Sequence, residues 1–233
     1  AQQLGMLDTN YMNSTGLPDP DHYTTARDIA TLSAAMIRDF PEHYKWYSEK
    51  EYTYNNITQH NRNKLLWRDN SVDGLKTGHT EEAGYCLAAS AKRGDMRLIA
   101  VVLGTRSENA RAQEILKLLN YGFRFFETHQ LYQAGASITD TKVWKGAEQQ
   151  MALGLASNLS VTVPRGQYES LTAKTNIQQP VIAPIAAGTQ LGEVEIRLGD
   201  DVVARQPLVA LKAVEQGSWW RRLVDHVLLW IWG

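Results

Sequence analysis

Three strand-like segments follow one another between Ser71 and Gly104, and only short turns separate them. Short turns join antiparallel neighbours, so this part of the chain is predicted to form an antiparallel sheet. The last two segments flank Arg93-Gly94-Asp95 and are predicted to pair as a hairpin. Met96–Gly104 is almost entirely apolar, which is typical of a strand buried on both faces.

Helices are predicted before and after these strands. Apolar residues recur at helical spacing over Thr24–Phe40, where Thr25 and Asp28 fit a capping box. Ser107–Phe126 has the pattern of a second, longer helix, whereas the polar stretch that ends at Asn70 is predicted to be irregular. An antiparallel sheet with helices packed on it is an α+β arrangement.

The character of the sequence changes after Glu127. Glycine and proline residues separate short runs in which apolar and polar residues alternate, as in Leu159–Val163 and Glu193–Leu198. Short strands at regular turn spacing predict a small all-β sandwich. We therefore predict three parts: an α+β part over residues 1–127, a β-sandwich over residues 128–216 and a terminal helix over residues 217–233.

Composition excludes several functions. Lys plus Arg number 24 and Asp plus Glu number 25, so the chain lacks the basic surface that nucleic acid requires. The six histidines show no metal-ligand spacing and no glycine-rich phosphate loop occurs, so neither a metal nor a cofactor is predicted. Cys86 is the single cysteine, which rules out a disulfide within the chain, and it is predicted to be a buried, inert thiol.

The first strand-like segment, Ser71–Thr80, carries Lys76-Thr77-Gly78 at its middle, followed by His79. An edge strand can accept an extended peptide as an additional strand, and a glycine lets a substrate carbonyl approach closely. The Lys76 ammonium and the Thr77 hydroxyl suit a terminal carboxylate, and the backbone N–H of His79 would supply half of an oxyanion hole. The alternative is that the tripeptide is an ordinary strand end.

This motif resembles the third signature of the penicillin-recognising serine enzymes, which also carry Ser-x-x-Lys and Ser-x-Asn. The resemblance extends over essentially the whole chain. The segments TTARDIATLSAAMIRDF, NRNKLLW, VDGLKTGHT, AGYCLAASA, YGFRFFET and TVPRG are similar to a low-molecular-mass penicillin-binding protein of the D-alanyl-D-alanine carboxypeptidase type, peptidase family S11. This resemblance implies a partial β-lactamase/transpeptidase-like domain followed by the β-sandwich.

The resemblance also implies roles for individual residues. Lys76 and Thr77 would hold the terminal carboxylate of a peptidoglycan pentapeptide ending in D-Ala-D-Ala, or that of a β-lactam. Gly78 would also bind the substrate, and the backbone N–H just after it, from His79, would complete the oxyanion hole. Arg111, at the start of the following helix, would assist with the carboxylate; the alternative for Arg111 is an exposed helix charge. The implied activity is that of a serine-type hydrolase that removes the terminal D-alanine through an acyl-enzyme.

The remaining catalytic motifs are not found in this sequence. No serine has a lysine three residues later, and Ser107-Glu108-Asn109 matches Ser-x-Asn only by chance, because it follows the Lys-Thr-Gly strand. In the family's order both motifs precede that strand, so the chain is expected to be the C-terminal portion of a carboxypeptidase and inactive alone. Two alternatives remain: a β-lactamase on the same scaffold and a non-catalytic, truncated membrane-associated module.

The final segment, SWWRRLVDHVLLWIWG, is predicted to form an amphipathic helix. Arg221, Arg222, Asp225 and His226 fall on one arc, which Leu229 and Trp232 interrupt. The opposite arc is predicted to insert at the headgroup level of a membrane and contains Trp219, Trp220, Leu223, Val227, Trp230 and Ile231. Similarity to the family's membrane anchor implies peripheral attachment at the periplasmic face of a bacterial inner membrane. The alternative is a helix that packs on the body of the protein.

Overall fold

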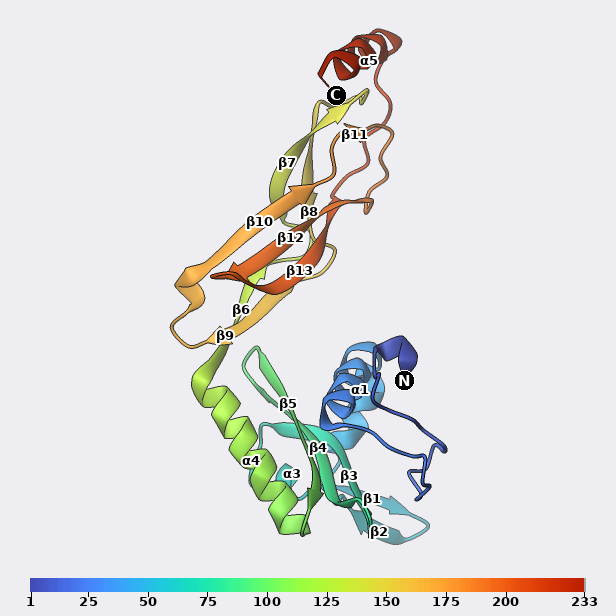
Figure 1. The fold of residues 1–233 in the computed structure, drawn as a ribbon, viewed down its shortest axis with the longest axis vertical. Helices are drawn as coiled ribbons and strands as arrows, with labels where there is room; N and C mark the ends of the chain where they lie inside the picture. The colour runs from blue at the N-terminus through green and yellow to red at the C-terminus, as the bar shows by residue number, and fades with distance from the viewer. Residues whose placement is uncertain (233) are drawn as a thin grey trace. The chain divides into compact units, whose positions relative to one another are not determined.

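The computed structural model describes the backbone of residues 1–232 and the side chains of residues 1–231. The chain divides into two compact units, Ala1–Phe125 and Phe126–Gly233, which are described separately below (Figure 1).

The first unit contains the predicted antiparallel sheet. Its strands are β3 (Val72–Thr80), β4 (Gly84–Arg93) and β5 (Met96–Thr105), in the order β3-β4-β5. The hairpin turn between β4 and β5 includes Gly94, whose φ of 58° lies in the left-handed region that favours glycine. Because β4 is central, β3 is an edge strand, as the interpretation of its Lys-Thr-Gly segment requires.

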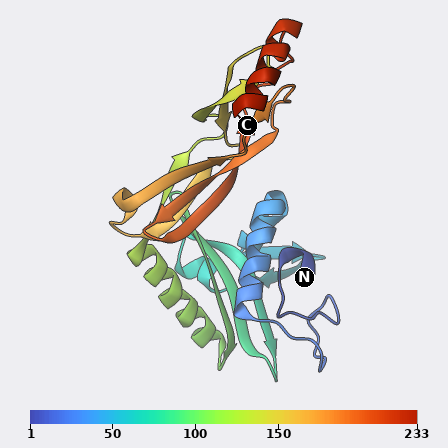
Figure 2. The ribbon, with the colours of Figure 1, turned by 45° about the horizontal axis from the view of Figure 1, so that its top comes forward.

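Two helices cover opposite faces of this sheet, α1 (Ala26–Asp39) and α4 (Glu108–Phe125), as Figures 1 and 2 show. The predicted cap of α1 is present: the Thr25 hydroxyl accepts a hydrogen bond from the Asp28 amide. The Asp28 carboxylate differs from a capping box, because it accepts instead from the Asp8 amide and the Thr9 hydroxyl. It thereby fastens the N-terminal segment to α1.

The prediction that β5 is buried on both faces is wrong for the chain that the structure describes. Along β5 only Met96 and Ala100 are buried, and the remaining residues are half-buried or exposed. β5 lies at the second edge of the three-stranded sheet, so it has a neighbouring strand on one side only. Its side chains are therefore covered less completely than those of a central strand.

The polar stretch before Asn70 contains short elements that its composition did not predict. They are β1 (Glu51–Tyr54), β2 (Ile57–His60), the helices α2 (Pro41–Tyr44) and α3 (Leu65–Arg68), and the 3₁₀ turn η2 (Lys45–Ser48). A further 3₁₀ turn, η1 (Gln2–Leu4), precedes α1. β1 and β2 form a hairpin whose turn residues, Asn55 and Asn56, have φ values of 49° and 60°. Asparagine tolerates this left-handed conformation, so the Asn-Asn pair was the available signal.

The second unit has the predicted all-β architecture. Its strands are β6 (Phe126–Tyr132), β7 (Ser137–Trp144), β8 (Gln150–Gly154), β9 (Leu159–Pro164), β10 (Leu171–Ile177), β11 (Val181–Ile182), β12 (Gln190–Leu198) and β13 (Asp201–Ala210), with the 3₁₀ turn η3 (Tyr168–Ser170). Six strands pair in the order β10-β12-β13-β8-β7-β11, and β6 pairs with β9. Side chains of both sheets share one core, which includes Val163, Val194 and Leu208.

The alternation predicted for two of these strands has different outcomes. Along β9, Leu159, Val161 and Val163 are buried and the residues between them are exposed, as predicted. Along β12, Glu195 is buried although the alternation places it outward. Arg197 and Arg205 pair with its carboxylate at 3.2 and 2.9 Å, which compensates the charge that would otherwise be costly to bury.

The chain ends in the helix α5 (Trp219–Trp232), within the predicted terminal segment. Among the described residues no helix combines the length and the apolar character needed to cross a membrane.

Candidate active site

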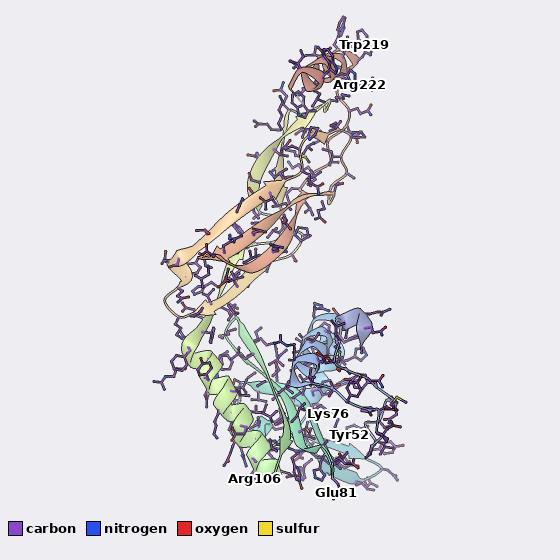
Figure 3. The ribbon with its side chains drawn as sticks, in the orientation of Figure 1. Tyr52, Lys76, Glu81, Arg106, Trp219 and Arg222 are labelled. Atoms are coloured by element: carbon purple, nitrogen blue, oxygen red, sulfur yellow. The ribbon has the colours of Figure 1, made fainter. Side chains whose placement is uncertain are left out.

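A cleft of about 1110 Å³ in the first unit, here called the β3 cleft, lies along the edge strand β3. The five residues predicted from the sequence to bind the substrate or to form the oxyanion hole all line it: Lys76, Thr77, Gly78, His79 and Arg111. The lining also includes the segment Tyr11–Gly16, and Figure 3 labels Lys76 on its strand. The structure therefore brings together residues of β3 and the first turn of α4.

The fold itself does not require a glycine at position 78. A Cβ added to Gly78 would meet only the Cβ of Cys86, at an ordinary contact distance of 3.8 Å. By contrast, a Cβ added to Gly74 on the same strand would meet the Tyr44 hydroxyl at 2.5 Å. Packing within the sheet therefore does not account for the glycine at position 78, and its predicted role in the close approach of a substrate backbone stays a prediction.

Arg111 is not an exposed helix charge. Arg111 is only 4% exposed, and its Nη1 donates a hydrogen bond to the Gly78 carbonyl at 3.2 Å. The first turn of α4 places it there, and Glu108 in the same turn lies 3.9 Å from its second guanidinium nitrogen. Arg111 thus joins the helix to the Lys-Thr-Gly strand and lines the β3 cleft.

Arg62 is a third cation in the β3 cleft, and the sequence reasoning assigned it no role. Its neighbour Asn63 is 1% exposed and donates to the Gly74 carbonyl on β3 at 3.0 Å. Asn61 holds the same loop by donating to the Glu49 carbonyl at 3.0 Å. Two asparagines therefore fasten the loop that carries Arg62, and neither contact can be read from the Asn-Arg-Asn pattern alone.

Three cations, Arg62, Lys76 and Arg111, meet the β3 cleft, and Glu108 brings a carboxylate to its lining. Partial burial lowers the pKa of the Lys76 ammonium, and the charges of Arg62 and Arg111 lower it further. A like-charged cluster in a concave surface raises the local concentration of anions. The arrangement therefore favours binding of a negatively charged group beside β3.

The lowered pKa of Lys76 predicts how anion binding depends on pH. Because the folded chain holds this proton less tightly than an ordinary lysine does, Lys76 loses its charge as pH rises, beginning below the ordinary value of 10.5. Affinity for a carboxylate ligand is expected to be full at neutral pH and to fall on this alkaline side. Titration calorimetry with a short peptide that ends in a free carboxylate, at several pH values, measures it. Lys76→Arg should move the fall to higher pH, and an unmoved fall would assign it to another group.

His79 and Cys86 also line the β3 cleft, and each was the subject of a prediction from the sequence. The ring of His79 packs on that of Tyr85, with centroids 4.0 Å apart, and the oxyanion role of the His79 amide stays a prediction. Cys86 is half-buried and lines the cleft, so the prediction of a buried thiol is wrong. It pairs with Gly78 across the two strands, and a Cβ added to Gly78 would lie 3.8 Å from the Cys86 Cβ.

Comparison with known proteins gives concordant results for both units. Residues 1–107 match the family described as D-alanyl-D-alanine carboxypeptidase, and residues 126–216 match the family described as penicillin-binding protein 5, C-terminal domain. The Escherichia coli D-alanyl-D-alanine carboxypeptidase DacC is 42% identical over 231 residues, which cover 98% of this chain and 58% of that protein. The chain thus spans about three-fifths of the length of the curated relatives it matches.

Solved structures show the same similarity. Penicillin-binding protein 5 from Haemophilus influenzae superposes with a TM-score of 0.81 at 41% identity, covering 92% of this chain and 63% of that one. Penicillin-binding protein D2 from Listeria monocytogenes, solved in its cefotaxime-bound form, has a TM-score of 0.50 at 33% identity and covers 52% of this chain and 51% of that one.

Proposed function

The chain belongs to the D-alanyl-D-alanine carboxypeptidase family of penicillin-binding proteins, and we propose that it supplies the carboxylate-binding half of such an active site. The observation that carries this proposal is the cluster of Arg62, Lys76 and Arg111 in one cleft beside an edge strand. The substrate is a peptidoglycan pentapeptide, whose D-Ala-D-Ala end carries the negative charge that these cations attract.

The proposed binding mode follows from the exposed edge of β3. The peptide lies along β3 as an additional strand, and its terminal carboxylate is held by the Lys76 ammonium and the Thr77 hydroxyl. Arg111 lies behind Gly78, its guanidinium bonded to that residue's carbonyl. A β-lactam enters the same cleft, because it also carries a carboxylate next to a reactive carbonyl. The cefotaxime-bound form of the Listeria relative supports this extension.

The proposed reaction is an acyl transfer to a serine and then to water. The serine oxygen attacks the carbonyl of the penultimate D-alanine, the terminal D-alanine leaves with a proton on its nitrogen, and water hydrolyses the resulting ester. The 233 residues contain no serine followed three residues later by lysine. We therefore propose that the polypeptide as given binds the substrate's carboxylate but does not form the ester by itself.

One experiment tests whether the serine must come from an upstream segment. The upstream segment of the Escherichia coli relative, expected to carry the family's nucleophile, is fused in front of the 233 residues to give what is here called the joined protein. We expect the joined protein to release D-alanine from a D-Ala-D-Ala pentapeptide and to leave a peptide ending in L-Ala-L-Ala intact. A folded joined protein that binds the peptide but releases no D-alanine would contradict the proposed reaction.

A second function is proposed for α5, namely peripheral attachment to the periplasmic face of the bacterial inner membrane. The supporting observation is exposure: Trp219, Trp220 and Trp230 are 59%, 68% and 86% exposed, and Leu223, Val227 and Ile231 are also exposed. Tryptophan favours the headgroup region, and so large an exposed apolar arc is costly in water. The Trp219 and Arg222 labels of Figure 3 mark this helix.

Removing α5 is expected to abolish membrane binding. A chain that ends at Gln216 loses the whole apolar arc. It keeps the β-sandwich core, because every buried residue of that core lies before position 216. Sedimentation with phosphatidylcholine–phosphatidylglycerol vesicles should recover the full chain in the pellet and the shortened chain in the supernatant. Pelleting of the shortened chain to the same extent would refute the role of α5.

A further inference from the structure

The segment that leads into α5 is hydrogen-bonded to the turn between β7 and β8, residues 145–149, here called the β7–β8 turn. The Gly217 amide donates to the Lys145 carbonyl at 2.8 Å, and the Ala147 amide donates to the Glu215 carbonyl at 2.8 Å. A Cβ added to Gly217 would lie 2.6 Å from the Gly146 carbonyl oxygen, so the two backbones approach more closely than any other residue allows. The start of α5 is therefore fixed to the sandwich.

Side chains of α5 contact the same turn. The Asp225 carboxylate accepts a hydrogen bond from the Lys145 amide at 2.6 Å, and the Arg221 guanidinium donates to the Ala147 carbonyl at 3.3 Å. The Lys145 ammonium also lies 3.2 Å from Nδ1 of His226. Lys145 itself has a φ of 59°, a conformation that few non-glycine residues adopt.

The exposure pattern of α5 agrees with these contacts. Arg221, Asp225 and Leu229 are half-buried and follow one another at intervals of four residues, so they form one stripe along the helix. The other side chains described in α5 are exposed. Leu229 interrupts the polar arc in the sequence because it lies on this stripe, whereas Leu223 and Val227 lie on the side of the helix turned away from it.

We propose that Asp225 is a positioning residue that locks α5 to the β7–β8 turn, so that helix and sandwich form one rigid body with the apolar arc facing outward. The helix is then not a flexible tether: the sandwich meets a lipid surface at a fixed angle. What the arc contacts rests on the membrane attachment proposed above, but the lock itself does not.

The lock is tested first in solution with the full chain. Asp225→Ala removes the acceptor of the Lys145 amide, and hydrogen exchange of that amide, followed by NMR, is expected to become at least about tenfold faster. Asp201→Ala, an exposed carboxylate at the start of β13, is the matched control and should change nothing. Unchanged protection of core amides such as those of Val194 and Ile196 shows that the sandwich remains folded.

The orientation of α5 is tested by distance measurement. Spin labels on Arg222→Cys in α5 and Lys174→Cys in β10, in a Cys86→Ser background, should give a narrow distance distribution that Asp225→Ala broadens. A broadened distribution together with faster Lys145 exchange supports the lock. An equally narrow distribution, or unchanged Lys145 exchange, overturns it.

Vesicle binding separates the lock from the membrane proposal. Asp225→Ala keeps every apolar residue of the arc, so it should still sediment with phosphatidylcholine–phosphatidylglycerol vesicles while its label distances stay broad. If the native chain does not sediment, membrane attachment is refuted and the solution measurements still decide the lock.

Discussion

Replacing Lys76 by methionine is expected to slow acylation of the joined protein by penicillin about a hundredfold or more. Methionine keeps most of the side-chain length and removes the charge that faces the β3 cleft. The ammonium is partly desolvated and reinforced by Arg62 and Arg111, so the carboxylate it meets gains more from it than in open water. Stopped-flow measurement with a fluorescent penicillin gives the acylation rate constant.

Lys92→Met is the matched control, because Lys92 is an exposed lysine of the adjacent strand β4 and does not line the β3 cleft. It should acylate at the native rate. If Lys76→Met also acylated at the native rate, the charge at position 76 would have no part in holding the ligand.

The 233-residue chain alone is expected to form no covalent adduct with penicillin. Removing the nucleophile from a serine hydrolase of another fold lowers kcat roughly a millionfold. In these 233 residues no serine is followed three positions later by a lysine, which is the family's arrangement of nucleophile and base. Mass spectrometry after incubation with penicillin should show the unmodified mass, whereas the joined protein gains one penicillin per chain. Stoichiometric labelling of the chain alone would mean that another nucleophile serves the β3 cleft.

Local patterns predicted those elements that depend mainly on neighbouring residues. The turn at Gly94 fixed the β4–β5 hairpin, the Thr25 hydroxyl capped α1, and alternation from Leu159 to Val163 gave the inner face of β9. In each case the residues that determine the structure lie within a few positions of one another. The Lys-Thr-Gly strand was also predictable, because its neighbours in sequence are its hairpin partners in the sheet.

Features that depend on distant residues were not predictable. The role of Arg62 follows from Asn63, whose partner Gly74 lies on another element. Burial of Arg111 follows from the Gly78 carbonyl, which is 33 positions away. Similarly, Leu229 appeared to interrupt a polar arc until the helix was placed against the β7–β8 turn. Sequence periodicity describes one element at a time and carries no information on such contacts.

Recognition of the ligand's carboxylate by the β3 cleft is tested most directly by comparing penicillin with its methyl ester, which lacks that charge. In the joined protein the free acid should acylate at least about tenfold faster than the ester, as the loss of one charge-assisted hydrogen bond predicts. In Lys76→Met this preference should shrink toward unity. A preference that survives undiminished in Lys76→Met would contradict the assignment of the carboxylate to Lys76.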